Sequence, residues 1–274
     1  MSEIVLFEVA DDVAVLTFNR PDRLNAWIPE MQTRYFDLLE ECASRADVRA
    51  IVVTGAGRGF CAGADMQALQ DLTSGERSSN GSAAPGAGHD PRPVTFPLTI
   101  PKPVIAAING ACAGLGFVYA VMCDLRFAAA EAKFTTAFAR RGLVAEHGIS
   151  WMLPRLIGPS RALDLLLSGR VILGTEAAEL GVVNQALAGE RVLEEALTYA
   201  RMLAAESSPA SMARMKQQVY ADLERPLPES LEAANQLMAE SFTGPDFGEG
   251  VRSFVERRPP KFEPVSGAPA GATS

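Results

Sequence analysis

Two glycine- and alanine-rich turns are the strongest chemical signal in the sequence. The first, GAGRGFCAGAD at 55–65, follows the apolar run 50–54, and the second, GACAGLG at 110–116, follows the apolar run 103–109. A turn between a strand and a helix leaves backbone N–H groups free at the helix N-terminus, where they can bind negative charge. Two such turns can direct their amides at one oxygen atom.

Other uses of glycine-rich turns fit this sequence poorly. Neither turn has the GxGxxG spacing of a dinucleotide site, and no Walker motif is present. The four cysteines lie in mainly apolar or Gly/Ala-rich contexts without CxxC spacing, which predicts reduced thiols. These observations favour stabilisation of an oxyanion over covalent catalysis.

The bulk composition is that of a soluble enzyme. The chain has 274 residues, enough for one or two domains, with 48% hydrophobic and 21% charged residues. A net charge of −8 argues against nucleic-acid and anionic-membrane partners. No apolar run is long enough to span a bilayer and no signal peptide is evident, so a cytoplasmic location is expected. With only His89 and His147, no metal site is expected.

The elements that must position the turns follow from periodicity. Residues 4–9 and 13–19 read as a hairpin joined at Asp11 and Asp12, and Pro29 begins a helix to residue 43. A short helix follows residue 64, and another runs from the second turn through Met122. The segment 73–95 is rich in Gly, Ser, Ala and Pro, which indicates a mobile loop, either a lid or a tolerated insertion. Further helices are predicted at 159–168, 175–180, 190–206, 208–224, 228–242 and 245–257.

Five segments, in this order, resemble the crotonase superfamily of enoyl-CoA hydratases and isomerases over about residues 4–262. The resemblance implies an α/β spiral of ββα units at 1–200, a helical trimerisation region at 201–262 and a disordered tail at 263–274. It also implies an acyl-CoA substrate, no cofactor because coenzyme A is part of the substrate, and a homotrimer or homohexamer. The segments are NRPDRLNAW (19–27), GAGRGFCAGAD (55–65), PKPVIAAINGACAGLGF (101–117), CDLRFAAAEAKF (123–134) and SGRVILGTEAAELGVVNQ (168–185).

The resemblance assigns the oxyanion hole to the backbone N–H groups of Ala64 and Leu115. Many relatives have glycine at the second position, but a backbone donor survives the change to leucine if the side chain points away. Removing one donor of such a hole typically costs about 3–4 kcal/mol of transition-state stabilisation. The hole indicates an enolate intermediate of an acyl thioester and leaves the reaction open.

The two glutamates of the classical hydratases are absent. The corresponding positions are Val118 and Phe138, which cannot transfer protons. Glu146 remains, in an apolar stretch whose Ser150 and Pro154 resemble the catalytic motif of peroxisomal-type Δ3,Δ2-enoyl-CoA isomerases. An apolar setting raises a carboxyl pKa toward neutrality, which suits a single base that takes a proton from C2 and returns it to C4.

Several alternatives remain open at this stage. Glu146 could instead cap a helix near His147 or pair with Arg140 or Arg141. His147 could donate a proton, orient a water as in an altered hydratase, or be structural, and Asp65 could be a helix N-cap. A thioester or C–C hydrolase and a non-catalytic CoA binder also fit an oxyanion hole.

Contacts to coenzyme A are implied by the resemblance alone. Arg23 and Lys261 would lie near the phosphates or adenine, although Arg23 could be a solvated surface charge. Backbone groups at 62–66 would meet the adenine. The candidates for binding CoA are therefore Arg23, Ala62, Ala64, Asp65, Met66 and Lys261. Five further residues are candidates for the acyl pocket, although each could belong to the core instead: Met66, Leu69, Phe96, Trp151 and Phe242.

Overall fold

The strands form two sheets that the chain builds in alternation. The computed structural model describes residues 3–67, 70 and 90–265. Its six-stranded sheet has the order β1-β2-β3-β5-β7-β10, and its four-stranded sheet has the order β4-β6-β8-β9. The bounds are β1 (Val5–Ala10), β2 (Val13–Phe18), β3 (Ala50–Gly55), β4 (Gly59–Cys61), β5 (Val104–Ile108), β6 (Ala111–Ala113), β7 (Leu125–Ala129), β8 (Lys133–Thr135), β9 (Ile172–Leu173) and β10 (Gln185–Leu187).

This alternation is the predicted spiral. Each of the pairs β3/β4, β5/β6 and β7/β8 gives one strand to the large sheet and the next to the small sheet. Neighbours from β2 to β10 in the large sheet are parallel, whereas β1 and β2 form the antiparallel hairpin predicted around Asp11 and Asp12. The predicted α/β class and hairpin are confirmed.

The helices predicted from Pro29 and from residue 159 onward are confirmed to within about two residues, whereas most of the short helix predicted after residue 64 lies outside the described residues. Pro29 lies in the first turn of α1, as predicted. Their bounds are α1 (Pro29–Ser44), α3 (Leu115–Val121), α4 (Ile149–Ile157), α5 (Pro159–Ser168), α6 (Gly174–Leu180), α7 (Val192–Glu206), α8 (Pro209–Asp222), α9 (Leu227–Thr243) and α10 (Pro245–Glu256), with short 3-10 helices at Pro21–Arg23, Phe96–Thr99, Ala139–Arg141 and Gly189–Arg191.

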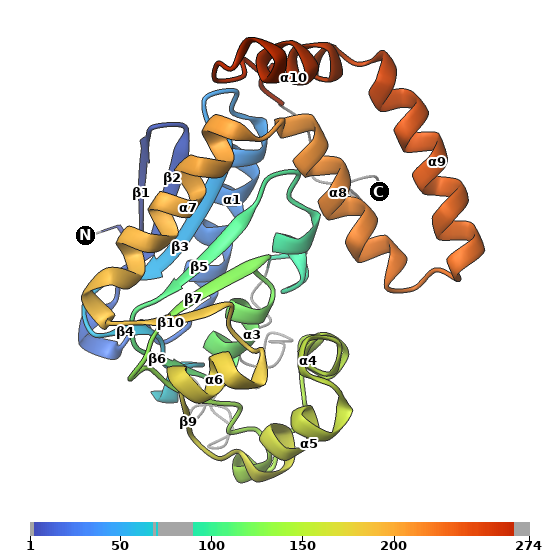
Figure 1. Cartoon of the computed structure of the whole chain (residues 1–274). Helices are drawn as coiled ribbons and strands as arrows, with labels where there is room; N and C mark the ends of the chain where they lie inside the picture. The colour runs from blue at the N-terminus through green and yellow to red at the C-terminus, as the bar shows by residue number, and fades with distance from the viewer. Residues whose placement is uncertain (1–2, 68–69, 71–89, 266–274) are drawn as a thin grey trace.

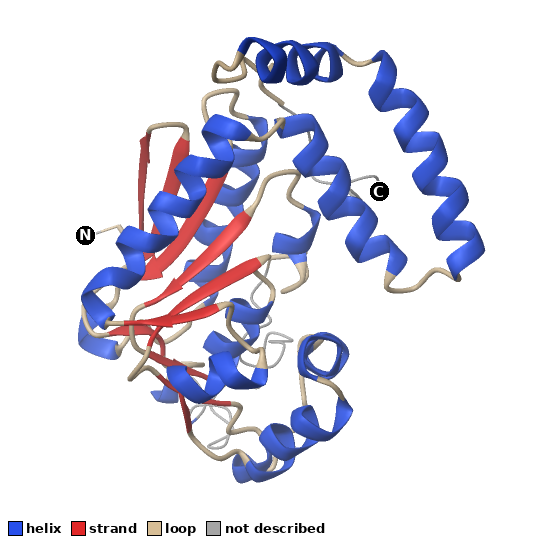
Figure 2. Ribbon diagram, viewed as in Figure 1, coloured by secondary structure: helices blue, strands red, loops and turns tan. Residues whose placement is uncertain are grey.

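The C-terminal region is helical, as predicted. The predicted boundary at residue 200 falls inside α7, which packs along the large sheet through Ala196, Ala200 and Ala204. Figures 1 and 2 show α7 lying over the strands, while α8, α9 and α10 extend to one side of them. On α8, Lys216 pairs with Asp124 at 2.7 Å and so fixes this helix to the core.

Two predicted segments fall mostly on residues that the structure does not describe. Most of the loop predicted at 73–95 and most of the tail predicted at 263–274 lie outside the described residues. No helix within the described part of the chain is long and apolar enough to cross a membrane.

Helix α3 packs closely against β4 because Gly116 has no side chain. A Cβ atom added at Gly116 would lie 2.1 Å from the carbonyl oxygen of Cys61 and 2.8 Å from the Cys61 Cβ. Real Cβ atoms do not approach a backbone oxygen so closely, and the neighbour here is backbone that cannot swing away. The sequence therefore needs glycine at this point for helix and strand to pack.

We predict that Gly116→Ala destabilises the protein by about 1–3 kcal/mol or more, because overpacking must push α3 off β4. Urea unfolding of both proteins measures the loss. The control is Gly248→Ala on α10, where an added Cβ meets nothing within 4 Å and alanine gains helix propensity of up to about 1 kcal/mol. Equal stability of the two variants would contradict the packing argument.

Candidate active site

The two turns meet because the strands before them pair in parallel. Residues of β4 and β6 face each other in the register Gly59 with Ala111 and Cys61 with Cys112. Carboxyl ends of parallel neighbours lie at one edge of a sheet, so the residues that follow each strand are brought together. Sequence reasoning placed both motifs in turns and missed these two short strands, because runs of three residues are too short to show a periodicity.

The contact itself is made by glycine backbone. Gly63 has φ +95° and Gly114 has φ +49°, a region that residues with side chains rarely adopt. A Cβ on Gly63 would lie 2.9 Å from the Ala113 oxygen and 3.7 Å from the Leu115 nitrogen, and one on Gly114 would lie 4.0 Å from the Gly63 Cα. The predicted pair of turns is therefore a real juxtaposition.

The Ala64 amide faces away from its neighbouring chain segment. In the bridge to Trp27, the carbonyl of Gly63 accepts from Trp27 N–H at 2.7 Å, and the Asp65 N–H donates to the Trp27 carbonyl at 3.1 Å. Ala64 lies between these two bonds with its own N–H directed to the other side. Among the described residues, neither this amide nor that of Leu115, the first residue of α3, donates a hydrogen bond. The arrangement can bind an anionic oxygen.

A buried asparagine holds the loop that carries this bridge. Asn25 accepts from the Arg20 N–H at 2.8 Å, and its Nδ2 donates to the carbonyls of Ala56 and Gly59 at 3.0 and 2.8 Å. Its φ of 55° is one that asparagine tolerates better than most residues. Sequence reasoning missed this role, although an Asn inside RPDRLNA, next to the bridging Trp27, was the available signal.

The side chain of Asp65 is engaged within the protein. It pairs with Arg20 at 2.9 Å and accepts from the Gln67 N–H at 3.0 Å, which is the N-cap contact considered from the sequence. Burial opposes its ionisation, but the Arg20 and Gln67 hydrogen bonds prevail and lower the pKa of this carboxyl. Only its backbone is left for a ligand.

The positions of the two absent glutamates are apolar interior. Val118, one turn into α3, is fully buried, and Phe138 retains 4% of its surface. Both belong to the hydrophobic core. The site therefore presents hydrocarbon where relatives with two glutamates would present carboxyl groups.

Glu146 lies in a turn that packs against the end of α3. An added Cβ on Gly148 would lie 3.6 Å from Met122 Cε and 3.4 Å from the Thr95 methyl group, so residues 146–148 sit beside the helix whose first amide belongs to Leu115. The Glu146 side chain is 27% exposed, and burial raises its pKa. A raised pKa near neutrality is what a general base requires.

The structural alternatives for Glu146 find no support. The N-cap of α4 is Gly148, with no side-chain capping bond, so the expected cap by Glu146 is wrong. Arg140 directs its Nε to the Ser168 carbonyl at 2.8 Å, and no ion pair joins Glu146 to Arg140 or Arg141. Within the described residues, the one basic side chain within 4 Å of its carboxylate is His147, whose Nε2 lies 3.7 Å from Oε2.

His147 has an unusual environment. Its Nε2 is buried without a hydrogen-bond partner among the described residues, and its φ is 55°. Burial lowers the pKa of the imidazole, because it disfavours the charged form. A neutral imidazole beside a half-buried carboxyl can take part in hydrogen bonding and proton transfer.

The other predicted site residues are dispersed. Arg23 is exposed in the 3-10 helix Pro21–Arg23, Ala62 is half-buried and Met66 is 54% exposed. Phe96 is buried in the core, Trp151 is half-buried beneath Arg155, and Leu69 lies outside the described residues. Phe242 and Lys261 are exposed on the C-terminal side, and α10 lies at the opposite end of the molecule from β4 and β6 (Figure 1). One chain therefore does not bring these two residues to the turns.

Comparison with known proteins identifies the family of this chain. The model of the enoyl-CoA hydratase/isomerase family matches residues 8–264. The chain is 34% identical, over 96% of its length and 99% of the relative's, to 1,2-epoxyphenylacetyl-CoA isomerase of Escherichia coli.

Two solved structures are similar in fold as well as sequence. One is a putative enoyl-CoA hydratase from Streptomyces coelicolor, with a TM-score of 0.84, 34% identity and coverage of 95% of this chain and 94% of that one. The other is an enoyl-CoA hydratase from Mycobacterium marinum, with a TM-score of 0.69, 47% identity and coverage of 82% and 100%. With the parallel β4–β6 pair and the spiral of strands, these matches establish that the chain is an enzyme of the enoyl-CoA hydratase/isomerase family, the crotonase superfamily.

Proposed function

We propose that this enzyme converts 3-enoyl-CoA to 2-enoyl-CoA, with the amides of Ala64 and Leu115 as the oxyanion hole and Glu146 as the single base. The observation that carries the proposal is the half-buried Glu146 beside α3, combined with apolar residues at both positions where a hydratase carries glutamate. A CoA thioester is the substrate class expected of the family, with no further cofactor.

The proposed reaction moves one proton and one double bond. The Glu146 carboxylate takes a proton from C2, and the electron pair passes to the thioester carbonyl, giving an enolate held by the two amides. The charge then returns through C2 to C4, the double bond moves from C3–C4 to C2–C3, and the Glu146 carboxyl gives the same proton to C4. Preorganised amides stabilise the enolate without reorganisation, which is the main electrostatic term in such sites.

Binding of coenzyme A is proposed to use two sets of groups. Arg23 and the backbone of Ala62, Ala64, Asp65 and Met66 follow the first turn, and the exposed Met66 is free to contact a ligand. Lys261 would act from the C-terminal region of a second copy, because α10 lies away from the turns of its own chain.

Hydration of 2-enoyl-CoA is the second candidate. The names of the Streptomyces and Mycobacterium relatives favour it. His147, at 3.7 Å from the Glu146 carboxyl, would supply the second polar group that orients a water. Thioester hydrolysis and binding without turnover are the remaining outcomes of the assay given below.

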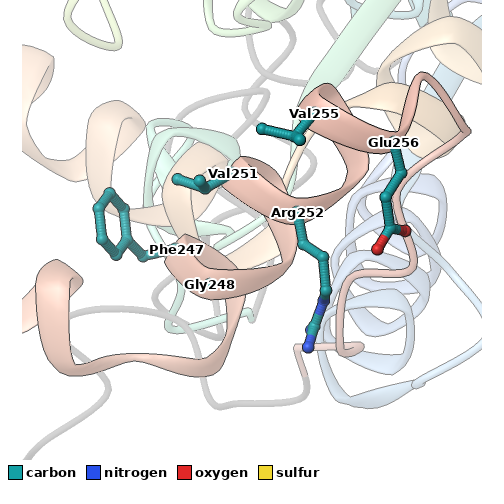
Figure 3. A pocket seen from close by; sticks show the side chains of 6 residues that line it. All are labelled: Phe247, Gly248, Val251, Arg252, Val255 and Glu256. Carbon is teal, nitrogen blue, oxygen red and sulfur yellow. The ribbon is translucent and has the colours of Figure 1, made fainter.

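We further propose that α10 takes part in a homotrimer, or in a hexamer of two trimers. Its inner side carries the buried Glu249 and Ser253, while Phe247, Val251 and Val255, spaced four residues apart, line a shallow cavity of about 450 Å³ on the outer side (Figure 3). Phe254 and Val255 are 85% and 73% exposed. Clustered apolar groups of this kind mark a protein interface, and the resemblance makes a second copy of this chain the partner.

We predict that Glu146→Gln lowers kcat for 3-enoyl-CoA isomerisation by about 10²–10⁴-fold, because glutamine cannot accept the proton. Purified wild type and variant are assayed on 3-enoyl-CoA and 2-enoyl-CoA of several chain lengths. Glu194→Gln, a change at an exposed glutamate on α7, should leave the rate unchanged.

The same panel separates the candidates. Equal activity of wild type and Glu146→Gln on 3-enoyl-CoA would rule out Glu146 as the base. Hydration of 2-enoyl-CoA without isomerisation would favour the second candidate, release of free CoA would favour hydrolysis, and micromolar CoA binding without turnover would indicate a binding protein.

The isomerisation rate should rise with pH through a pKa above the ordinary glutamate value of about 4.3, since the base acts deprotonated and burial raises its pKa.

The raised pKa of Glu146 also affects the stability of the fold. The folded state holds the Glu146 proton more tightly than the unfolded state, so this contribution is present at low pH and is lost as pH rises through the raised pKa. Thermal unfolding of Glu146→Gln, compared with wild type from pH 4 to pH 7, should therefore favour the variant increasingly. An unchanged difference would refute the shift.

Val255→Asp should convert the oligomer to a monomer, because it places a charge in an apolar contact. Light scattering of the purified proteins reports the mass. Glu194→Gln, at an exposed glutamate on α7, is the control and should keep the wild-type mass. A wild-type mass for Val255→Asp would exclude this face from the interface.

A further inference from the structure

The two turns of the candidate site come from different parts of the chain, and a pair of aromatic rings connects them. The indole of Trp27 stacks on the phenol ring of Tyr119, with ring centroids 3.9 Å apart and planes inclined by 28°. Both side chains are buried in the hydrophobic core. A close-packed interior holds such rings in one arrangement, because the neighbouring side chains leave no space for another. The stack therefore fixes Trp27 relative to Tyr119.

Trp27 holds the first turn through its own backbone. Its N–H donates to the Gly63 carbonyl at 2.7 Å, and its carbonyl accepts from the Asp65 N–H at 3.1 Å. Ala64 lies between these two bonds, as the bridge partner of Trp27. A shift of the Trp27 backbone therefore moves the Ala64 amide with it, so the position of the indole ring affects one half of the proposed oxyanion hole.

Tyr119 holds the helix that carries the other half. It lies on α3, four residues and about one helical turn after Leu115. Its hydroxyl donates to Oε1 of the buried Gln32 on α1 at 3.1 Å. The ring of Tyr35, also on α1, packs edge-on against it, with the centroids 5.8 Å apart. Tyr119 thus ties α3 to α1 as well as to Trp27.

This second contact along α3 is needed because the first does not orient the helix. Gly116 lets α3 approach Cys61 of β4 and so sets the distance between them. A helix held at one point can still tilt or rotate about it, which changes the direction of the Leu115 N–H. Tyr119 lies three residues, or about 4.5 Å, further along the axis, and a contact there removes this freedom.

We propose that Trp27 and Tyr119 are positioning residues whose stack sets the distance and direction of the Ala64 amide relative to the Leu115 amide. The proposal rests on the assignment of these two amides as the oxyanion hole under the proposed function. Preorganised donors are effective when they are directed at the place where charge develops, so the stack acts on the enolate far more than on the uncharged thioester.

The ionisation of a bound 3-ketoacyl-CoA reports on the hole without turnover. This ligand loses a C2 proton to the solvent, and the electron pair passes to the carbonyl oxygens, which gives an enolate that absorbs in the near ultraviolet. Wild type should lower the pKa of the bound ligand below that of the free ligand, because the two amides stabilise the enolate. Trp27→Leu should raise this pKa by about one unit or more, a change of about 10-fold in the ionisation constant, since small displacements in an active site have large effects.

Matched variants separate positioning from a general loss of packing. Trp27→Phe keeps a ring for the stack and should keep most of the wild-type shift. Phe127→Leu removes another buried ring, which contacts Tyr199 at 5.7 Å between β7 and α7. It should leave the pKa of the bound ligand unchanged, although urea unfolding shows a lower stability. Tyr119→Leu removes the other half of the stack and takes the place of Trp27→Leu if that variant does not fold.

The two halves of the stack should also act as one unit. Trp27→Leu combined with Tyr119→Leu should raise the pKa of the bound ligand little more than either change alone, because the second change has no stack left to remove. Additive shifts would mean that the two rings act independently and would overturn the pairing.

The proposal is overturned if Trp27→Leu or Tyr119→Leu holds the ligand with the wild-type pKa, or if Phe127→Leu raises that pKa as much. Its failure differs from that of the proposed function. An equal pKa for free ligand and ligand bound to wild type would remove the oxyanion hole and this proposal with it. A lowered pKa in wild type that neither variant changes would leave the hole in place and remove the positioning pair alone. Because the measurement needs no base, it is independent of the test of Glu146.

Discussion

The close approach of α3 to β4 is the constraint on which the candidate site depends. Gly116 lets the helix backbone lie against Cys61, and the parallel pairing of β4 with β6 then brings Gly63 beside Gly114. Both free amides are consequences of this packing, since Ala64 and Leu115 are the residues that follow. A hole made from backbone needs no particular side chain, which explains how leucine can stand at the second position, with its side chain buried to 2% exposure.

Burial shifts the pKa values of Glu146 and His147 in opposite directions. It raises the pKa of Glu146 and lowers that of His147, because in each case it disfavours the charged form. The result is a carboxyl that titrates closer to neutrality beside a neutral imidazole. Had either partner paired with an arginine, its pKa would be governed by that charge, as the Arg20 pair governs Asp65. The absence of an arginine partner at Glu146 is a condition for the proton transfer proposed above.

Sequence reasoning succeeded where the signal is local and failed where it depends on contacts far apart in the chain. The hairpin, α1 and the C-terminal helices follow from periodicity, and the two turns follow from composition. The strands β4 and β6 were missed because their three-residue runs are defined only by pairing with each other. The predicted boundary at residue 200 falls inside α7, whose alanine face is recognisable only against the sheet. Asn25 was missed because its carbonyl partners lie more than thirty residues away.

The family relationship defines the substrate class and the intermediate, while the reaction depends on a few side chains. Val118 and Phe138 remove both carboxyl groups from the hydrophobic floor of the site, so proton transfer must come from another element. The turn at 146–148 is the element we propose for it, because this turn lies beside Met122, which follows the helix whose first residue is Leu115. When the enolate site is made of backbone and the base comes from a separate loop, a different loop can give a different reaction.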